Sequence, residues 1–181
     1  MEPVRNPGRQ GDHMEFKLKS ISRAGIPEAI SKAELYRNLN EPGEAESICR
    51  DVLTVEPDDQ TALRLLGLAL TDQFTGAASD RHAEAESIFQ GLKDPYARLY
   101  YTGIVHERRA KALLRAGARP HTVIVLFEEA LTCFDHAEKI RPEGNDDAIL
   151  RWNRCVRLLQ QHASDRREDL EAFDAGDSPP V

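Results

Sequence analysis

The sequence predicts an all-α fold, and three observations lead to this expectation. Of the 181 residues, 40% are hydrophobic and 30% are charged, which is typical of a globular chain. Apolar residues recur at helical spacing, and no segment shows a convincing alternation of apolar and polar residues. Proline, glycine and short polar residues separate these periodic runs. Together the three features predict about seven helices joined by turns.

Each expected helix begins at a recognisable signal. Pro27 and Pro42 stand where a first helical turn tolerates proline, because the N–H that proline lacks has no partner inside the helix. Asp58 and Asp59 precede an apolar run, as capping residues do. The later helices follow Asp94-Pro95, Arg119-Pro120 and Asn145-Asp146. We expect helices at residues 27–39, 43–55, 60–73, 80–92, 95–116, 120–140 and 146–162.

The chain divides into one helical domain and two terminal segments. Residues 26–163 hold the periodic runs and are numerous enough for one domain with a sizeable core. Residues 1–25 are expected to be disordered or extended, and Met14 offers a second possible start. Residues 164–181 carry six acids against two arginines and are expected to be a disordered acidic tail.

Composition excludes several classes of protein. No apolar run approaches the roughly 18 residues of a membrane span, and the first residues lack the apolar stretch of a secretory signal, so we expect a cytoplasmic protein without a membrane partner. The net charge of −7 argues against nucleic acid as a partner. Cys49, Cys133 and Cys155 are far apart and form no CxxC pair, which argues against disulfides and zinc. No glycine-rich phosphate loop is present, and no cofactor or metal is expected.

The pentamer Glu-Ala-Glu-Ser-Ile occurs at residues 44–48 and again at 84–88, a separation typical of stacked repeats. In the run LRLLGLAL, the large residues and Gly67 follow the pattern that opens a tetratricopeptide repeat. The close of such a repeat is matched by Ala45, Cys49 and Pro57, and again by Ala130, Phe134, Ala137 and Pro142. On these motifs the chain resembles the tetratricopeptide family and is similar to uncharacterised bacterial members of it.

This resemblance covers about residues 26 to 162 and implies a tetratricopeptide-like stack of three helical hairpins plus a C-terminal capping helix. Within it, Ala45 and Ala85 are expected to be small contacts between paired helices, with solvated glutamates around them. The clamp by which some family members hold acidic chaperone tails is not reproduced, because Ile30 and Glu34 stand where Lys and Asn are expected.

The helix at 95–116 places a mixed stripe opposite its expected core face. Projected at about 100° per residue, this side of the helix holds Tyr100, Ile104, Arg108, Lys111 and Arg115. The resemblance places the stripe in the concave groove of the stack. Other helices offer residues of comparable expected exposure, namely Arg37, Arg64, Asn153 and Arg157. Cations beside an apolar anchor suit the carboxylates of a partner, although a merely solvated surface is the alternative.

These features predict a non-catalytic protein–protein interaction module, a scaffold or adaptor that binds an acidic or extended peptide segment. One alternative is a helical enzyme that uses the region of Cys133 and His136, which lie three residues apart. Another is a helical-repeat RNA binder, for which only Tyr100 and Tyr101 supply aromatic rings beside the cations. The acidic tail has the form of a ligand for the same groove, which predicts autoinhibition within a chain or weak self-association between chains.

Overall fold

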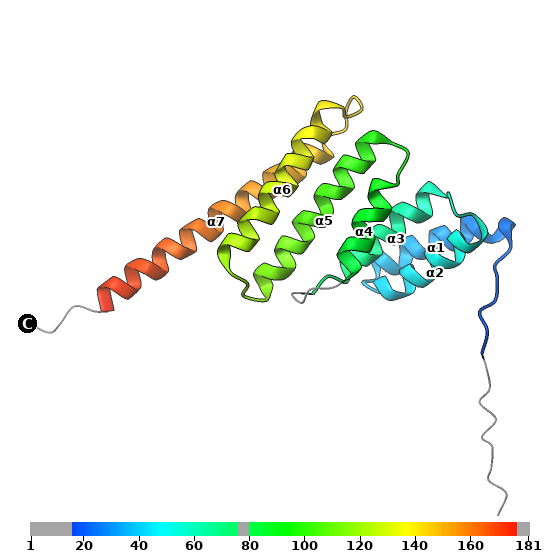
Figure 1. The fold of residues 1–181 in the computed structure, drawn as a ribbon, viewed down its shortest axis with the longest axis horizontal. Helices are drawn as coiled ribbons and strands as arrows, with labels where there is room; N and C mark the ends of the chain where they lie inside the picture. The colour runs from blue at the N-terminus through cyan, green and yellow to red at the C-terminus, as the bar shows by residue number, and fades with distance from the viewer. Residues whose placement is uncertain (1–15, 76–79, 177–181) are drawn as a thin grey trace, which may run out of the picture.

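The computed structural model describes residues 16–75 and 80–176, and these residues are all helical or irregular, without a strand (Figure 1). The all-α prediction is confirmed for this part of the chain. A short 3-10 helix, η1 (Arg23–Gly25), precedes the first α-helix. The α-helices are α1 (Ile26–Asn38), α2 (Pro42–Val55), α3 (Gln60–Asp72), α4 (Asp80–Gln90), α5 (Pro95–Arg115), α6 (Pro120–Lys139) and α7 (Asp147–Gly176).

The helix starts follow from local chemistry, as the sequence predicts. Proline occupies the first turn of α1, α2, α5 and α6. The carboxylate of Asp59 accepts a hydrogen bond of 2.8 Å from the backbone N–H of Ala62, and Asp94 caps α5 in the same way through Tyr96 N at 3.0 Å. Consequently the expected helix boundaries agree with the structure within two residues, except at the end of α7.

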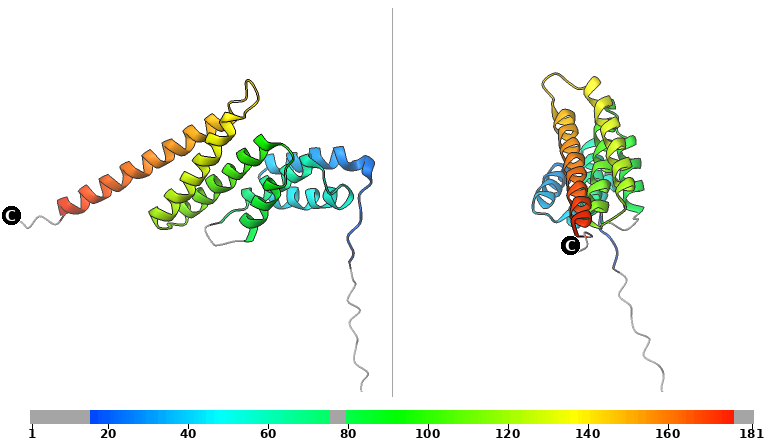
Figure 2. Two further views of the ribbon diagram at one scale, coloured as in Figure 1. Left: turned by 45° about the horizontal axis from the view of Figure 1, so that its top comes forward. Right: turned by 90° about the vertical axis from the view of Figure 1, so that its left-hand side faces the viewer.

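The helices form a row in which each packs against the next in sequence (Figure 1, Figure 2). In addition, α1 contacts α3 and α3 contacts α5. The first, third and fifth helices therefore lie beside one another along the row, and residues projecting from them can meet. The helices α1 and α2 form one end of the row, and α7 lies at the other end (Figure 1).

Small residues and aromatic rings hold neighbouring helices together. Ala45 and Ala85, which the resemblance assigns to helix contacts, are both fully buried. Two glycines face buried phenylalanines: a Cβ built at Gly67 would lie 2.5 Å from the ring of Phe89. At Gly67, helices α3 and α4 therefore approach each other more closely than any larger residue would allow.

Two glutamates of the repeated pentamer form hydrogen bonds and ion pairs, whereas the sequence analysis expects solvated side chains. Arg50 of α2 donates to Glu46 on its own helix at 2.9 Å and to Glu84 of α4 at 2.8 Å. Glu46 also accepts from Gln73 at 2.8 Å and from Arg81 at 2.7 Å. Burial alone would raise the pKa of Glu46, but these hydrogen bonds lower it overall. The motif therefore joins α2 to α4 through charge, besides its buried alanines.

The end of α7 differs from the prediction. The sequence predicts a helix that stops at residue 162 and a disordered tail from 164, whereas α7 continues as a helix through Gly176 and extends beyond α6 (Figure 1). The prediction relied on apolar periodicity, which fades there. Because the chain has neither proline nor glycine between Ala148 and Gly176, and is rich in good helix formers, the helix continues without that periodicity. Residues 177–181 of the predicted tail lie outside the described part.

At the other terminus, residues 16–22 adopt neither helix nor strand, residues 23–25 form η1, and the first 15 residues of the predicted segment 1–25 lie outside the description. Among the described helices, none combines the length and the apolar content that crossing a membrane requires.

Candidate functional site

Four cations surround a pocket of about 290 Å³ on the side of the row that the odd-numbered helices share. Its lining consists of Thr71, Asp72, Arg108, Lys111, Arg115 and Arg151. Three of the predicted groove residues, all on α5, are therefore brought together. Helix α3 supplies the threonine and the aspartate, and α7 supplies the fourth cation. The pocket thus lies where α3, α5 and α7 contribute side chains to one space.

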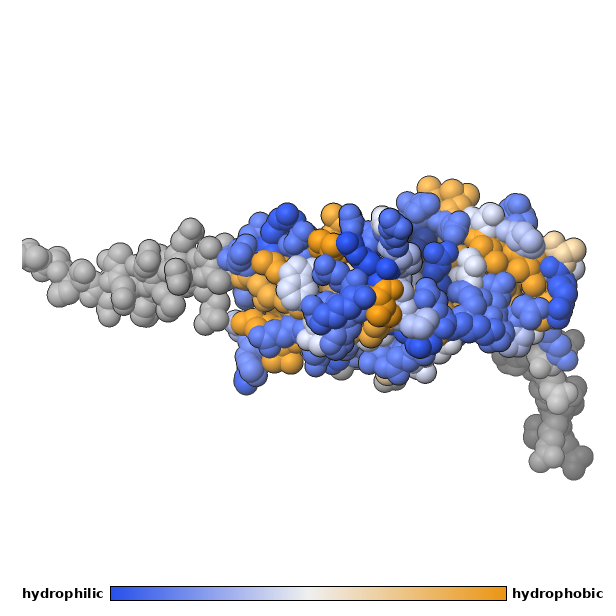
Figure 3. Space-filling model, turned by 90° about the horizontal axis from the view of Figure 1, so that it is seen from above, coloured by the Kyte–Doolittle hydropathy of each residue, from blue (hydrophilic) through white to orange (hydrophobic). Residues whose placement is uncertain are grey.

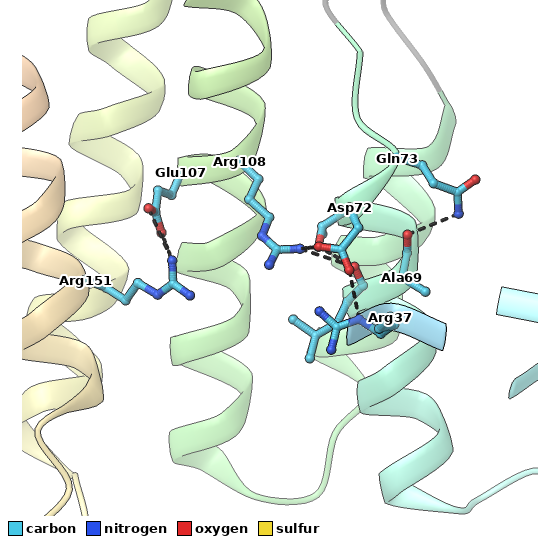
Figure 4. A network of polar contacts seen from close by, with 9 residues as sticks. Arg37, Ala69, Asp72, Gln73, Glu107, Arg108 and Arg151 are labelled. Atoms are coloured by element: carbon cyan, nitrogen blue, oxygen red, sulfur yellow. Dashed lines mark hydrogen bonds and ion pairs between the residues drawn. The ribbon is translucent and has the colours of Figure 1, made fainter. Parts of the chain in front are cut away.

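Asp72 lies between two arginines at one edge of this pocket (Figure 4). Its Oδ2 accepts a hydrogen bond of 2.8 Å from Arg37 Nε of α1, and its Oδ1 accepts from Arg108 of α5. The guanidinium of Arg108 also donates to Thr71 Oγ1 at 2.6 Å and to the carbonyl of Leu68 at 3.3 Å. One carboxylate therefore ties three helices together and fixes the orientation of Arg108. Burial lowers the pKa of Arg108, but an arginine beside a carboxylate stays charged.

A buried carboxylate organises the opposite edge. Glu107 has no solvent exposure, and its side chain accepts hydrogen bonds from Lys111 on the same helix and from Arg151 of α7, the latter at 3.4 and 3.5 Å (Figure 4). A buried charge requires such partners, because desolvation without them is costly. Lys111 and Arg151 are thereby held at the pocket wall, and α7 is joined to α5.

The charges do not cancel. The four cations face one carboxylate at the pocket wall, Asp72, and a second carboxylate beneath it, Glu107. Arg115 is exposed, and no carboxylate of the described residues forms an ion pair with it. The pocket therefore retains positive charge and at least one cation that is available to a visiting anion.

The two apolar members of the predicted stripe differ in exposure. Ile104 is only 2% exposed and packs with Phe127 and Phe134, so its assignment to an open groove is wrong. Tyr100 is half-buried and stacks on Tyr96 with ring centroids 5.7 Å apart. The reason is that α5 contacts α3, α4 and α6, so its buried arc is wider than the one face that the projection assumed.

The remaining predicted residues fall into two groups. Arg37 and Arg64 line a second pocket of about 210 Å³ between α1 and α3, where Arg64 lies 3.8 Å from Glu34. Asn153 and Arg157 are exposed on α7 and line neither pocket. The two pockets lie along the odd-numbered helices and are linked by Arg37, which reaches Asp72.

Two side chains that shape the candidate site, Glu107 and Arg151, were missed by the sequence analysis. In the helical projection Glu107 falls between the predicted stripe and the expected core face, and the sequence analysis assigned it to neither. Arg151 gave no local signal, because its role depends on the packing of α7 against the preceding helices.

The alternative site at Cys133 has the wrong electrostatics for a nucleophile. Burial, together with the charges of Glu129 and Glu86, raises the pKa of the Cys133 thiol to about 11. A catalytic cysteine needs the opposite shift, because the thiolate is the reactive form. His136 is exposed on the same helix. Burial likewise raises the pKa of Cys49 and Cys155 to about 12, so none of the three thiols has the lowered pKa of a catalytic cysteine.

The aromatic rings that an RNA-binding surface would need are already used in packing. Tyr101 stacks on the buried Phe89 at a centroid distance of 5.1 Å, and Tyr100 contacts Phe134 at 6.0 Å. Rings held in this way do not offer open faces to successive bases.

No group of three or more metal-ligating side chains occurs among the described residues. Comparisons with protein-family models, with curated proteins and with solved structures find no match to this chain.

Proposed function

We propose that this chain is a non-catalytic protein-interaction module whose cationic pocket receives a carboxylate from an acidic, extended segment of a partner protein. The observation that carries the proposal is the convergence of Arg108, Lys111, Arg115 and Arg151 on one pocket, where the described residues supply two carboxylates to offset them. Arginine suits this role because its planar guanidinium binds a carboxylate through two parallel hydrogen bonds.

The helix packing supports a tetratricopeptide-like reading of the fold. Under this proposal the hairpins are α1 with α2, α3 with α4, and α5 with α6, and α7 is the capping helix. In such a stack the first helix of each hairpin lines the concave face, and the contacts of α1 with α3 and of α3 with α5 agree with that arrangement. The glycine-to-phenylalanine contacts in the second and third hairpins support the same pairing.

The two pockets along this face favour an extended ligand over a small one. Arg37 belongs to the wall of one pocket and bonds to Asp72 at the edge of the other, so the pockets adjoin. An acidic segment that places one carboxylate in the larger pocket could follow the face toward Arg64. The predicted acidic tail is a poor intramolecular occupant, because α7 continues outward as a helix (Figure 1). Its weak binding to a second copy stays a proposal.

Fluorescence anisotropy with a labelled peptide of alternating Glu and Leu tests the proposal. We expect a Kd between about 10 µM and 1 mM that weakens as salt is added. Arg115→Glu should weaken binding at least about fivefold, because it replaces the available cation with a like charge. The matched control is Arg109→Glu, which changes another exposed arginine of α5 that does not line the pocket. Equal losses for the two variants would refute the site, and failure of the peptide to bind at low salt would refute the function.

A further inference from the structure

An apolar pocket of about 360 Å³ lies at the end of the row that α1 and α2 form. Its lining includes Ile21, Gly25, Ala29 and Ile48, with charged residues at its rim. Its volume is in the range of about 300–1,000 Å³ that is usual for ligand pockets. In the view of Figure 3, hydrophobic surface is visible at this end of the row, as it is at the other end and between them. The site is separate from the cationic pocket, which involves α3, α5 and α7.

The segment just before this pocket presents two large hydrophobic side chains to solvent. Phe16 is 87% exposed and Leu18 is 97% exposed, the largest exposed fractions among the described large hydrophobic residues. They alternate in sequence with Lys17 and Lys19, so the segment carries both apolar and basic side chains. Because both are exposed, the chain's own pocket does not receive them, and the segment leads away from α1 (Figure 1).

The rim of the pocket matches the charge of this segment. Glu28 and Asp51 belong to the lining, as does one cation, Lys32, which already pairs with Glu28 at 3.5 Å. Asp51 forms no ion pair with a cation of the described residues. A segment that inserts apolar side chains while carrying a lysine beside them would therefore meet an unpaired carboxylate at the rim.

We propose that this pocket is a self-association site, in which Phe16 and Leu18 of a second copy of the chain insert while Lys19 of that copy pairs with Asp51. A reciprocal exchange about a two-fold axis, in which each copy gives its segment and receives that of the other, closes at a dimer. The same event covers the exposed side chains of Phe16 and Leu18 and the half-buried Ile21 and Ile48 of the pocket.

Sedimentation equilibrium of the full chain between about 10 and 200 µM tests this dimer. We expect the mass to rise from 20.3 kDa toward twice that value. The variant Phe16→Ser with Leu18→Ser should remain monomeric over the range with an unchanged melting midpoint, since neither side chain is packed in the monomer. Leu150→Ser removes another exposed leucine, on α7, and should dimerise normally. A monomeric wild type, or a Phe16/Leu18 variant that still dimerises, would overturn the proposal.

A charge exchange identifies the partner surface. Asp51→Lys and Lys19→Glu should each weaken the homodimer about tenfold, because each places like charges together. An equal mixture of the two variants should recover the dimer. The native Lys19 of the Asp51→Lys variant then meets the native Asp51 of the Lys19→Glu variant, and the two substituted residues, which also carry opposite charges, meet at the other pocket. If the mixture dimerises no better than either variant alone, Lys19 and Asp51 do not meet and the exchange is wrong.

Discussion

The ring of Phe89 lies against Gly67 so closely that a Cβ at residue 67 would stand 2.5 Å from both Cε1 and Cζ. The same relationship recurs between Phe134 and Gly103, where the distance to Cε1 is 2.6 Å. These contacts pack α3 against α4 and α5 against α6, so the same type of glycine-to-phenylalanine contact occurs in two successive helix pairs. Real side chains essentially never approach at such distances, and both phenylalanines are almost fully buried.

Replacing Gly67 by leucine should therefore destabilise the fold by about 1 to 3 kcal/mol or more through overpacking. The matched control is Gly43→Leu in α2, where a Cβ meets nothing within 4 Å and the change should stay within about 0.5 kcal/mol. Urea melts followed by circular dichroism measure both. Equal midpoints for the two variants would show that α3 and α4 do not meet at Gly67.

Glu46 supports a second prediction, since it receives three side chains whereas Glu44 of the same motif is exposed. Glu46→Gln should lower the free energy of unfolding at pH 7 by about 1 to 2 kcal/mol, and Glu44→Gln by less than about 0.5 kcal/mol. The pKa of Glu46 is lowered in the fold, so its contribution is present above the unfolded pKa and is lost as pH falls through the folded one. The gap between the variants should accordingly shrink in acid, and a gap independent of pH would contradict the ion-pair role.

The helix starts could be predicted because proline and aspartate act within their own turn. Pro42 and Asp59 needed no distant contact to mark a boundary. The end of α7 could not be predicted from apolar periodicity, because a helix of good formers continues where that periodicity stops.

The candidate site was only partly predictable for a related reason. Arg108, Lys111 and Arg115 share a helix face, and spacing alone places them together. Ile104 shares that face in projection, yet its burial depends on helices that are remote in sequence. The partnership of Glu107 with Arg151 joins positions 44 residues apart, and no local pattern encodes it.

Glu107 leads to a third prediction, that removing this carboxylate costs less stability than removing its two cationic partners. Lys111 and Arg151 are partly exposed, whereas Glu107 is fully buried. Glu107→Leu lets both cations turn to solvent and should destabilise by about 1 to 2 kcal/mol, whereas Lys111→Met with Arg151→Met strands a buried carboxylate and should cost about 3 to 5 kcal/mol. Thermal and urea melts compare them. Adding Glu107→Leu to the double variant should recover part of this loss; if the resulting triple variant is no more stable than the double one, burial of an unpaired Glu107 is not the cause.

The cysteines lead to a fourth prediction, at alkaline pH. Burial raises the pKa of Cys133 to about 11 and that of Cys49 and Cys155 to about 12, each from an ordinary value of 9.0. A thiol whose pKa is raised by folding stabilises the fold fully below its unfolded pKa, and this stabilisation is lost as pH rises through the folded one. Stability should therefore fall between about pH 9 and 12, by at most about 1.4 kcal/mol per pH unit for each thiol.

Melts of the wild type and of Cys133→Ala over this window measure how steeply the free energy of unfolding falls with pH. The fall should be less steep in the variant, because it lacks the contribution of one thiol. Labelling by iodoacetamide at pH 8, located by mass spectrometry, should be slower at Cys133 than at a free thiol by about 100-fold, since the thiolate fraction falls tenfold per unit of pKa. Labelling as fast as free cysteine would instead favour a reactive site.

The last prediction separates the structural role of Asp72 from its effect on binding. Asp72 pairs with Arg37 and Arg108, and it is the carboxylate that already occupies one edge of the cationic pocket. Asp72→Asn should weaken the tie among α1, α3 and α5 and lower stability by about 1 to 3 kcal/mol. If the proposed function is correct, the same change also removes the carboxylate that pairs with Arg37 and Arg108. Both arginines can then pair with the peptide, so affinity for the Glu-Leu peptide should rise about three- to tenfold. The control Asp58→Asn removes an exposed aspartate paired with Lys93 at 2.7 Å, away from the pocket, and should alter stability by less than about 1 kcal/mol and leave binding unchanged. Opposite signs in stability and affinity distinguish competition within the pocket from simple damage to the fold, in which both would fall together.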